Sequence, residues 1–227
     1  MVVREACMTV SFDFREVPEN ERALLTRVQD ALTTLGATAS SFASAILAYV
    51  ETERLEQNLP TFEERVAFWR EHGHVKNAMA QRGAMLIYDF YRVQQRIQSL
   101  AARSEWVVAR TDRAKLKQSN KEFLYRFPHF ASLRNSAAHT AETLLSDEFQ
   151  DQRPTDNAIH GLEFGVPVLL AGALVNGNYV WTVNDRHLSY EVSVESAAVL
   201  TQCSFLFEDA FKPLLLPDVR SSAGEGD

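Results

Sequence analysis

Arg134, Asn135 and His139 are the residues whose types and spacing best suit chemistry. Histidine is the side chain suited to moving protons near neutral pH, and arginine clamps phosphate groups through two parallel hydrogen bonds. Together they suffice for attack of an RNA 2′-hydroxyl on the adjacent phosphate, with no metal ion. The segment therefore predicts a catalytic pair, Arg134 and His139, with Asn135 orienting the imidazole or the backbone around it.

A helix expected over 128–145 sets how these side chains face one another. At about 100° per residue, Arg134 and His139 lie about 140° apart around the axis, so they flank a cleft and do not stack. Asn135 and His139 are four residues apart and share a face. This arrangement suits a site at a seam between helices or between subunits.

The pattern is more specific than a bare Arg-x4-His spacing, of which about 0.5 chance matches are expected in such a chain. Requiring Asn directly after the Arg lowers that expectation to roughly 0.02. The similarly spaced pairs Arg65 with His72 and Arg153 with His160 have no Asn after the Arg. We therefore take the pattern at Arg134 as the candidate site.

The elements that must position this site are mostly helices, according to the spacing of apolar residues. The expected helices span about 19–58, 62–73, 75–104, 120–127, 128–145 and 195–211. Capping patterns at Thr61, Ser119 and Ser193 predict three of the N-termini. Gly36 is a candidate break in the first helix, and Gly73 is expected to end the second.

After residue 145 the pattern changes. A polar loop over 146–161 precedes short β-like runs, with turn signals at Asn176-Gly177 and Asn184-Asp185. The predicted fold class is mainly α, an antiparallel helical bundle with a small C-terminal β-hairpin or meander and a closing helix. The expected organisation is an arm or short strand over 1–17, a bundle over 18–145, the rest of the same domain over 146–215, and a disordered tail over 216–227.

Charge is unevenly distributed along this chain of 227 residues, whose net charge is −7. Residues 103–126 carry seven basic against three acidic side chains, whereas 140–163 carry one against six. A basic segment on an acidic protein can mark a contact with a polyanion, although a solvated helix face has the same composition.

Several classes of protein lack support in the sequence. It has no phosphate-binding glycine loop, no G-x-S-x-G elbow and no H-E-x-x-H motif. His72 and His74 lack further ligands at metal spacing, so neither a metal nor a cofactor is expected.

Cys7 and Cys203 are far apart and are interpreted as free thiols of a reducing compartment. Apolar stretches look too short and too charged to span a membrane, and no secretory signal is evident, so we expect a cytoplasmic protein.

The segment Leu133–His139 resembles the R-N-x-x-x-H signature of HEPN domains, which are all-helical modules. The preceding RFPHFASLRN resembles the Phe-Pro lead into the signature helix, and YDFYRVQQRIQ resembles the long helix that packs beside it. The hairpin NYVWTVNDRHLSYEVS and the closing FEDAF resemble a tail carried by some bacterial members. The resemblance covers roughly 20–215 in layout and 127–139 at motif level.

This resemblance implies a metal-independent endoribonuclease that leaves 2′,3′-cyclic phosphate ends and acts as a toxin or in antiviral defence. It implies a homodimer with Arg134 and His139 of both subunits facing each other, Asn135 in support, RNA as substrate, and a neutralising antitoxin or regulatory partner. Such nucleases often add an acidic residue from an earlier helix, for which Asp89 is the candidate. An ion pair of Asp89 with Arg92 is the alternative.

Two other interpretations stay open at this point. The same helical fold could serve as a binding or regulatory module without catalysis. A plain helical scaffold would instead bury His139 and hydrogen-bond it to a backbone carbonyl, with Arg134 in an ordinary surface ion pair.

Overall fold

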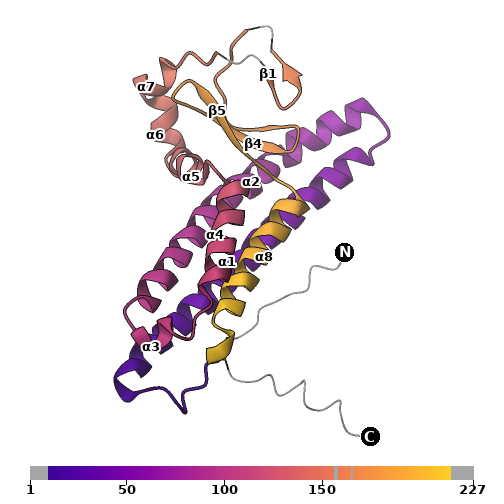
Figure 1. The fold of residues 1–227 in the computed structure, drawn as a ribbon. Helices are drawn as coiled ribbons and strands as arrows, with labels where there is room; N and C mark the ends of the chain where they lie inside the picture. The colour runs from indigo at the N-terminus through magenta and orange to yellow at the C-terminus, as the bar shows by residue number, and fades with distance from the viewer. Residues whose placement is uncertain (1–9, 156–157, 165, 216–227) are drawn as a thin grey trace, which may run out of the picture.

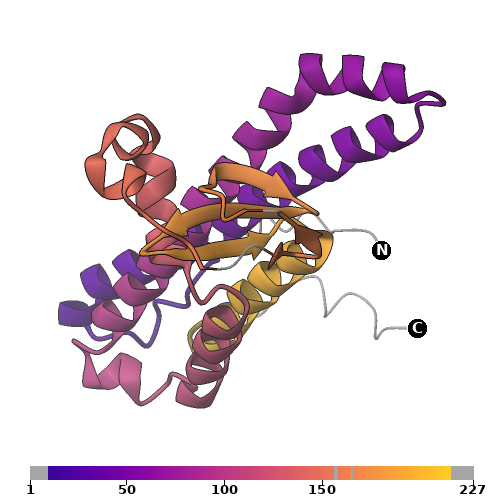
Figure 2. The same ribbon diagram turned by 90° about the horizontal axis from the view of Figure 1, so that it is seen from above.

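Two long antiparallel helices, α1 (Glu19–Gln57) and α2 (Phe62–Ala101), are the largest elements of the fold in the computed structural model (Figure 1). The structure describes residues 10–155, 158–164 and 166–215. The fold is mainly α, with a small antiparallel sheet near the C-terminus, as the sequence predicts. Seen from above, the sheet lies across one side of the helices and the α1–α2 turn extends beyond it (Figure 2).

Both long helices are continuous, which corrects two expectations. Gly36 does not interrupt α1, and Gly73 lies inside α2. Thr61 caps α2 with the predicted capping box to Glu64. A Cβ at Gly73 would lie 3.2 Å from Nε1 of Trp69, because the indole packs across the glycine. Glycine at this position costs about 1 kcal/mol relative to alanine, which is not enough to end the helix.

The bundle is completed by α3 (Glu105–Val108), α4 (Arg113–Arg126) and α8 (Val194–Ala210). The side chain of Asp112 caps α4, so the expected start at Ser119 is wrong. Ser119 is instead buried, where it accepts a hydrogen bond from Gln94 of α2 and donates one to the carbonyl of Cys203 in α8. Ser193 caps α8 as predicted.

Aromatic side chains fill the centre of the bundle. Phe123 of α4 lies 5.8 Å from both Phe90 and Tyr91 of α2, measured between ring centroids, and Phe42 of α1 meets Phe127 edge-on at 6.1 Å. These rings are buried or half-buried, so the apolar residues at helical spacing form the core that links α1, α2 and α4.

The sheet has three strands in the order β3 (Ala171–Val175), β4 (Asn178–Val183) and β5 (Arg186–Glu191). Both predicted turns are present, since Asn176, Gly177, Asn184 and Asp185 all have positive φ. Their side-chain types tolerate this left-handed backbone, which explains why the meander could be predicted.

The expected loop over 146–161 is wrong in part. It contains a short helix, α7 (Asp147–Gln150), capped by Ser146, and the strand β1 (Ala158–Ile159). β1 pairs with β2 (Leu162–Glu163) in a small hairpin. Ile159 packs with Val175 and Val180 of the main sheet, so this hairpin covers part of its outer face.

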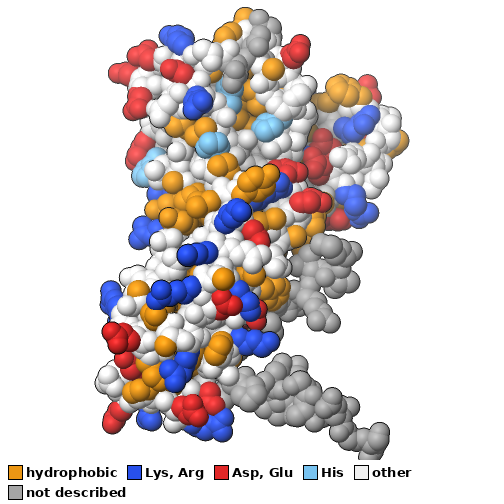
Figure 3. Space-filling model, viewed as in Figure 1, with side chains coloured by type: hydrophobic (Ala, Val, Ile, Leu, Met, Phe, Trp, Pro, Cys, Tyr) orange, Lys and Arg blue, Asp and Glu red, His pale blue; other side chains and the backbone are white. Residues whose placement is uncertain are grey.

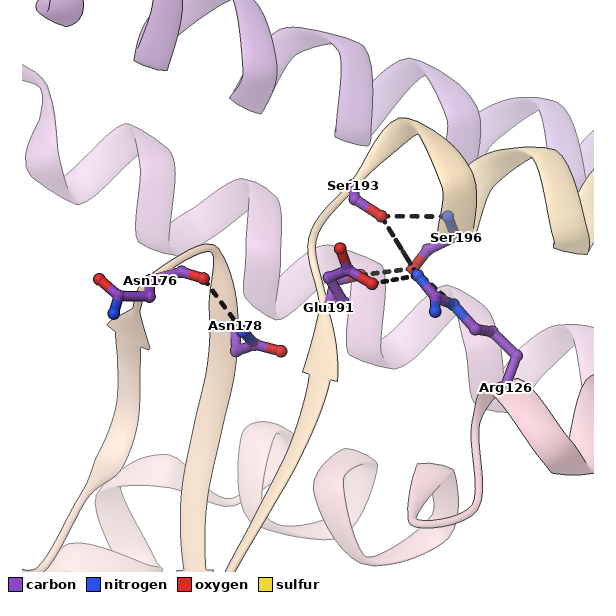
Figure 4. A network of polar contacts seen from close by, with 6 residues as sticks. All are labelled: Arg126, Asn176, Asn178, Glu191, Ser193 and Ser196. Atoms are coloured by element: carbon purple, nitrogen blue, oxygen red, sulfur yellow. Dashed lines mark hydrogen bonds and ion pairs between the residues drawn. The ribbon is translucent and has the colours of Figure 1, made fainter. Parts of the chain in front are cut away.

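Specific contacts attach the sheet to the helices. The hydroxyl of Tyr190 in β5 donates to the carbonyl of Ala80 in α2 at 2.5 Å. Arg126, at the end of α4, pairs with Glu191 and donates to the hydroxyls of Ser193 and Ser196 (Figure 4). These contacts join the end of β5 to the start of α8 and the end of α4.

The N-terminal and C-terminal ends of the described chain also meet. Phe12 forms an antiparallel bridge with Leu215, and the Asp13 amide donates to the carbonyl of Leu214 at 2.9 Å. The short strand expected near the N-terminus is reduced to this bridge in the described part. Cys7 and the tail over 216–227 lie outside the described residues.

α1 corrects the expectation that every apolar stretch is too short for a membrane. By length and composition alone, it is the helix among the described residues that could cross one. Eleven of its residues are buried in the protein and it packs against α2 and α8, which are the contacts of a core helix.

Candidate functional site

The predicted catalytic segment spans two helices, α5 (Phe130–Ala138) and α6 (Thr140–Leu145), and not one. His139 is the residue between them, with non-helical dihedral angles of φ −112° and ψ 34°. The carbonyl of Ala137 accepts hydrogen bonds from the side chains of Gln81 in α2, at 2.6 Å, and Thr140, at 2.9 Å. These two bonds hold the chain at the joint, where the single helix expected over 128–145 is divided into two.

Arg134 lies against α2. Its Cζ is 5.0 Å from the centroid of the Tyr88 ring, a cation–π contact, and its Nη1 donates to Oδ1 of Asn135 at 3.3 Å. Its Nε is buried without a hydrogen-bond partner. Arg134 forms no ion pair with any described residue. The guanidinium is therefore oriented by an aromatic face and keeps its charge available to an external anion.

His139 is exposed, with 57% of its side chain accessible, and its Nδ1 lies 2.9 Å from Oε2 of Glu142. Its backbone is fixed on both sides, because its amide donates to the carbonyl of Asn135 and its carbonyl accepts from the amide of Thr143. The buried His139 bonded to a backbone carbonyl, which the scaffold interpretation expects, is therefore not found. Its companion expectation, an ordinary surface ion pair for Arg134, is not met either.

Asn135 connects the two candidate residues. It is exposed, its side-chain oxygen accepts from Arg134, and its carbonyl accepts from the amide of His139. Replacement of its side chain would therefore free the guanidinium without removing the backbone bond to His139.

Asp89 is not brought into this group by any hydrogen bond or ion pair among the described residues. It is exposed on α2 and contacts neither Arg134 nor His139 through a hydrogen bond or ion pair. The alternative pair with Arg92 is also not formed in the described chain. Arg92 instead donates to the Tyr88 hydroxyl at 3.3 Å, with its Cζ 6.0 Å from the ring centroid.

Three residues of the site were missed from the sequence. Glu142 carries a signal in retrospect, because an acidic residue three positions after a histidine on a helix faces it. Tyr88 and Gln81 carry none, since they lie about fifty residues away on α2 and meet α5 only through tertiary packing.

A row of basic side chains runs along α4. Arg113, Lys117 and Lys121 are exposed, recur every four residues and form no ion pair with a described residue. The other two basic residues of α4 are engaged, Lys115 with Asp209 and Arg126 with Glu191. Figure 3 shows Lys and Arg side chains gathered on the face over α4. We call Arg113, Lys117 and Lys121 the α4 basic row.

Other candidate groups of the sequence have structural partners. Nδ1 of His72 lies 3.2 Å from the carbonyl of Phe68, whose ring stacks on the imidazole. Within the described ranges, no three His, Cys, Asp or Glu side chains are grouped so as to hold a metal. Burial raises the pKa of the Cys203 thiol to about 12, which makes it a poor nucleophile at neutral pH.

Comparisons with protein-family models, with curated proteins and with solved structures find no match for this chain.

Proposed function

We propose that this chain is a metal-independent endoribonuclease of the HEPN type. The observation that carries the proposal is the pairing, within six residues, of an exposed histidine and an arginine that has no carboxylate partner in the described chain. A phosphate-cleaving site needs a histidine that a ligand can reach and a cation that no carboxylate of the protein neutralises. The resemblance of Arg134-Asn135 and His139 to the R-N-x-x-x-H signature supports the same assignment.

The proposed reaction is attack of a ribose 2′-oxygen on the adjacent phosphorus. His139 takes the proton of the 2′-hydroxyl as the O2′–P bond forms and the P–O5′ bond breaks. Arg134 holds the non-bridging oxygens and stabilises the charge that develops on them. The departing 5′-oxygen takes a proton, so the products end in a 2′,3′-cyclic phosphate and a 5′-hydroxyl.

The proposal includes a homodimer, in which the Arg134 and His139 side chains of two protomers face one composite cleft. One His139 then accepts the 2′-hydroxyl proton, and the protonated His139 of the second protomer donates to the 5′-oxygen. The exposure of His139 on the single chain is compatible with a group completed by another copy.

The α4 basic row supports RNA as the substrate. Three exposed cations at four-residue spacing offer a track for phosphates, and the acidic side chains that neutralise Lys115 and Arg126 do not reach them. A role in toxicity or phage defence in the cytoplasm, with an antitoxin or regulatory partner, belongs to this proposal through the HEPN resemblance.

The test is incubation of wild type and His139→Ala with total RNA in EDTA, followed by analysis of the end groups. We expect wild type to leave cyclic phosphate ends and His139→Ala to lose about 10²- to 10⁴-fold in rate. His74→Ala serves as the matched control, because it also removes an exposed histidine, one that lies in α2. This variant should cleave normally.

Two outcomes would contradict the proposal. No cleavage by wild type at high concentration, with the dimer confirmed, favours the binding or regulatory module. Unfolding of His139→Ala, seen as a lost thermal transition in circular dichroism, makes His139 a structural residue. We expect the variant to stay folded, because the imidazole faces solvent and not the core.

A further inference from the structure

Glu142 contacts one ring nitrogen of His139 and leaves the other without a hydrogen-bond partner in the described chain. Oε2 of Glu142 lies 2.9 Å from Nδ1, and Nε2 makes no hydrogen bond to a described residue. A carboxylate accepts hydrogen bonds and cannot donate them, so Nδ1 must carry the hydrogen in this pair. The lone pair of a neutral imidazole is then on Nε2.

We infer that Glu142 is a positioning residue, which fixes the tautomer of His139 so that Nε2 is the atom that takes and returns the proton. This inference rests on the proposed nuclease function for its catalytic consequence. The tautomer itself is a property of the folded chain, measurable without RNA.

The backbone explains why a contact so exposed can be specific. His139 lies at the joint of α5 and α6, where its amide donates to Asn135 and its carbonyl accepts from Thr143 at 2.7 Å. Glu142 lies in the first turn of α6, one turn after His139, so its reach to the ring is set by the helix. The main chain thus fixes the base of the imidazole and Glu142 fixes its rotation.

Stability does not account for the pair. Glu142 is 81% exposed, and exposed ion pairs contribute little to the free energy of unfolding. The carboxylate also places negative charge beside a site proposed to bind phosphate, where it opposes binding. Glu142 weakens phosphate binding and adds little to the stability of the fold. Its presence is explained if it increases the rate of the proton transfer.

The test separates the hydrogen bond from the charge. Glu142→Ala removes both, and Glu142→Gln keeps an oxygen that can accept from Nδ1–H but loses the charge. Glu148→Gln is the matched control, because it removes the same charge from an exposed residue of the neighbouring helix α7. The first readout is ¹H–¹⁵N NMR of the imidazole at about pH 8.5, where histidine is ordinarily neutral, with the His139 signal assigned from His139→Ala.

We expect protonated Nδ1 and bare Nε2 in wild type, Glu142→Gln and Glu148→Gln, and a mixture of tautomers in Glu142→Ala. With RNA, kcat should fall about 10- to 100-fold in Glu142→Ala with KM unchanged or lowered, as for other residues that orient a functional histidine. Glu142→Gln should retain part of kcat, and Glu148→Gln should match wild type.

The outcomes distinguish this inference from the proposed function. An unchanged tautomer in Glu142→Ala, with wild type active, overturns the inference alone. An unchanged kcat in Glu142→Ala does the same. If wild type does not cleave RNA, the proposed function and the catalytic role of Glu142 both fail, and the NMR result then shows only whether the contact exists.

Discussion

The ring of Tyr88 holds the Arg134 guanidinium in place of a carboxylate. The 5.0 Å separation between Cζ and the ring centroid is a cation–π contact, worth roughly 0.5–2 kcal/mol depending on exposure. An aromatic face orients the cation without neutralising it, which an aspartate in the same place would do. In the proposed function, phosphate binding would therefore depend on a residue that does not itself touch the substrate.

Replacement of Tyr88 by leucine should lower the kcat/KM for RNA cleavage about fivefold, the equivalent of about 1 kcal/mol of lost orientation. Tyr88→Phe keeps the ring face and loses only the hydroxyl that accepts from Arg92, so it should stay within about twofold of wild type. Equal losses in the two variants would show that the hydroxyl matters and not the ring.

The Cys203 thiol gives the stability a dependence on alkaline pH. Burial raises its pKa from 9.0 to about 12, so between these values the unfolded state binds fewer protons than the folded state. The free energy of unfolding therefore falls as pH rises from 9, by up to ~1.4 kcal/mol per pH unit.

Urea unfolding between pH 8.5 and 10.5 measures this effect, and Cys203→Ala should show a shallower decline than wild type. Burial also raises the pKa values of Tyr179 and Tyr190, but wild type and Cys203→Ala both contain these tyrosines. The tyrosines therefore do not contribute to the difference between the two curves. Parallel curves for the two proteins would assign the decline to other groups.

At the scale of elements, Gly83 determines how closely the sheet approaches α2. A Cβ at this position would overlap the hydroxyl of Tyr190 and lie 3.3 Å from a ring carbon of Phe42. The hydroxyl cannot move away without breaking its bond to Ala80. Glycine is thus needed here for close approach and not for its backbone freedom.

Gly83→Ala should destabilise the protein by about 1–3 kcal/mol through overpacking. Gly36→Ala is the control, because its added methyl group would lie 4.0 Å from its nearest neighbour, Oγ of Ser204, and alanine is the better helix former. It should stabilise by about 0.5–1 kcal/mol. Chemical denaturation of both variants tests the opposite signs, and a loss in Gly36→Ala would contradict the argument.

The α4 basic row predicts how RNA binding depends on salt. Lys117→Gln/Lys121→Gln removes two phosphate contacts, so the slope of log Kobs against log salt should become shallower by about 1.4. Arg65→Gln/Arg70→Gln removes two exposed cations from the far part of α2 and should leave the slope unchanged. Equal changes in the two double variants would show that RNA responds to overall charge and not to α4.

At the scale of the whole molecule, the proposed cleft needs two chains. Sedimentation should give twice the chain mass of 25.6 kDa at micromolar concentration. Arg134→Ala and His139→Ala homodimers each lack one type of group, whereas a mixed dimer has one of each. Mixing the two inactive variants should therefore restore part of the cleavage, and not all of it, because water must replace the second His139 as the proton donor. Activity no greater than the sum of the separate variants would place a complete site within one chain.

The sequence by itself was enough for those features whose physical cause is local. The capping box at Thr61, the cap at Ser193 and the Asn-Gly turn at 176–177 were predicted because each depends on side-chain and backbone chemistry within a few residues. The mainly α class with a C-terminal meander follows from apolar spacing, which is also local.

Tertiary contacts decided the rest, because they can outweigh local preference. Gly73 lies inside α2 and does not end it, and Ser119 is a buried hydrogen-bonding residue and not a cap. The carbonyl of Ala137, next to the break at His139, accepts from Gln81, which lies more than fifty residues earlier in the sequence. The residue types of the candidate site were therefore readable from the sequence, whereas its geometry arises from where α2 lies against α5.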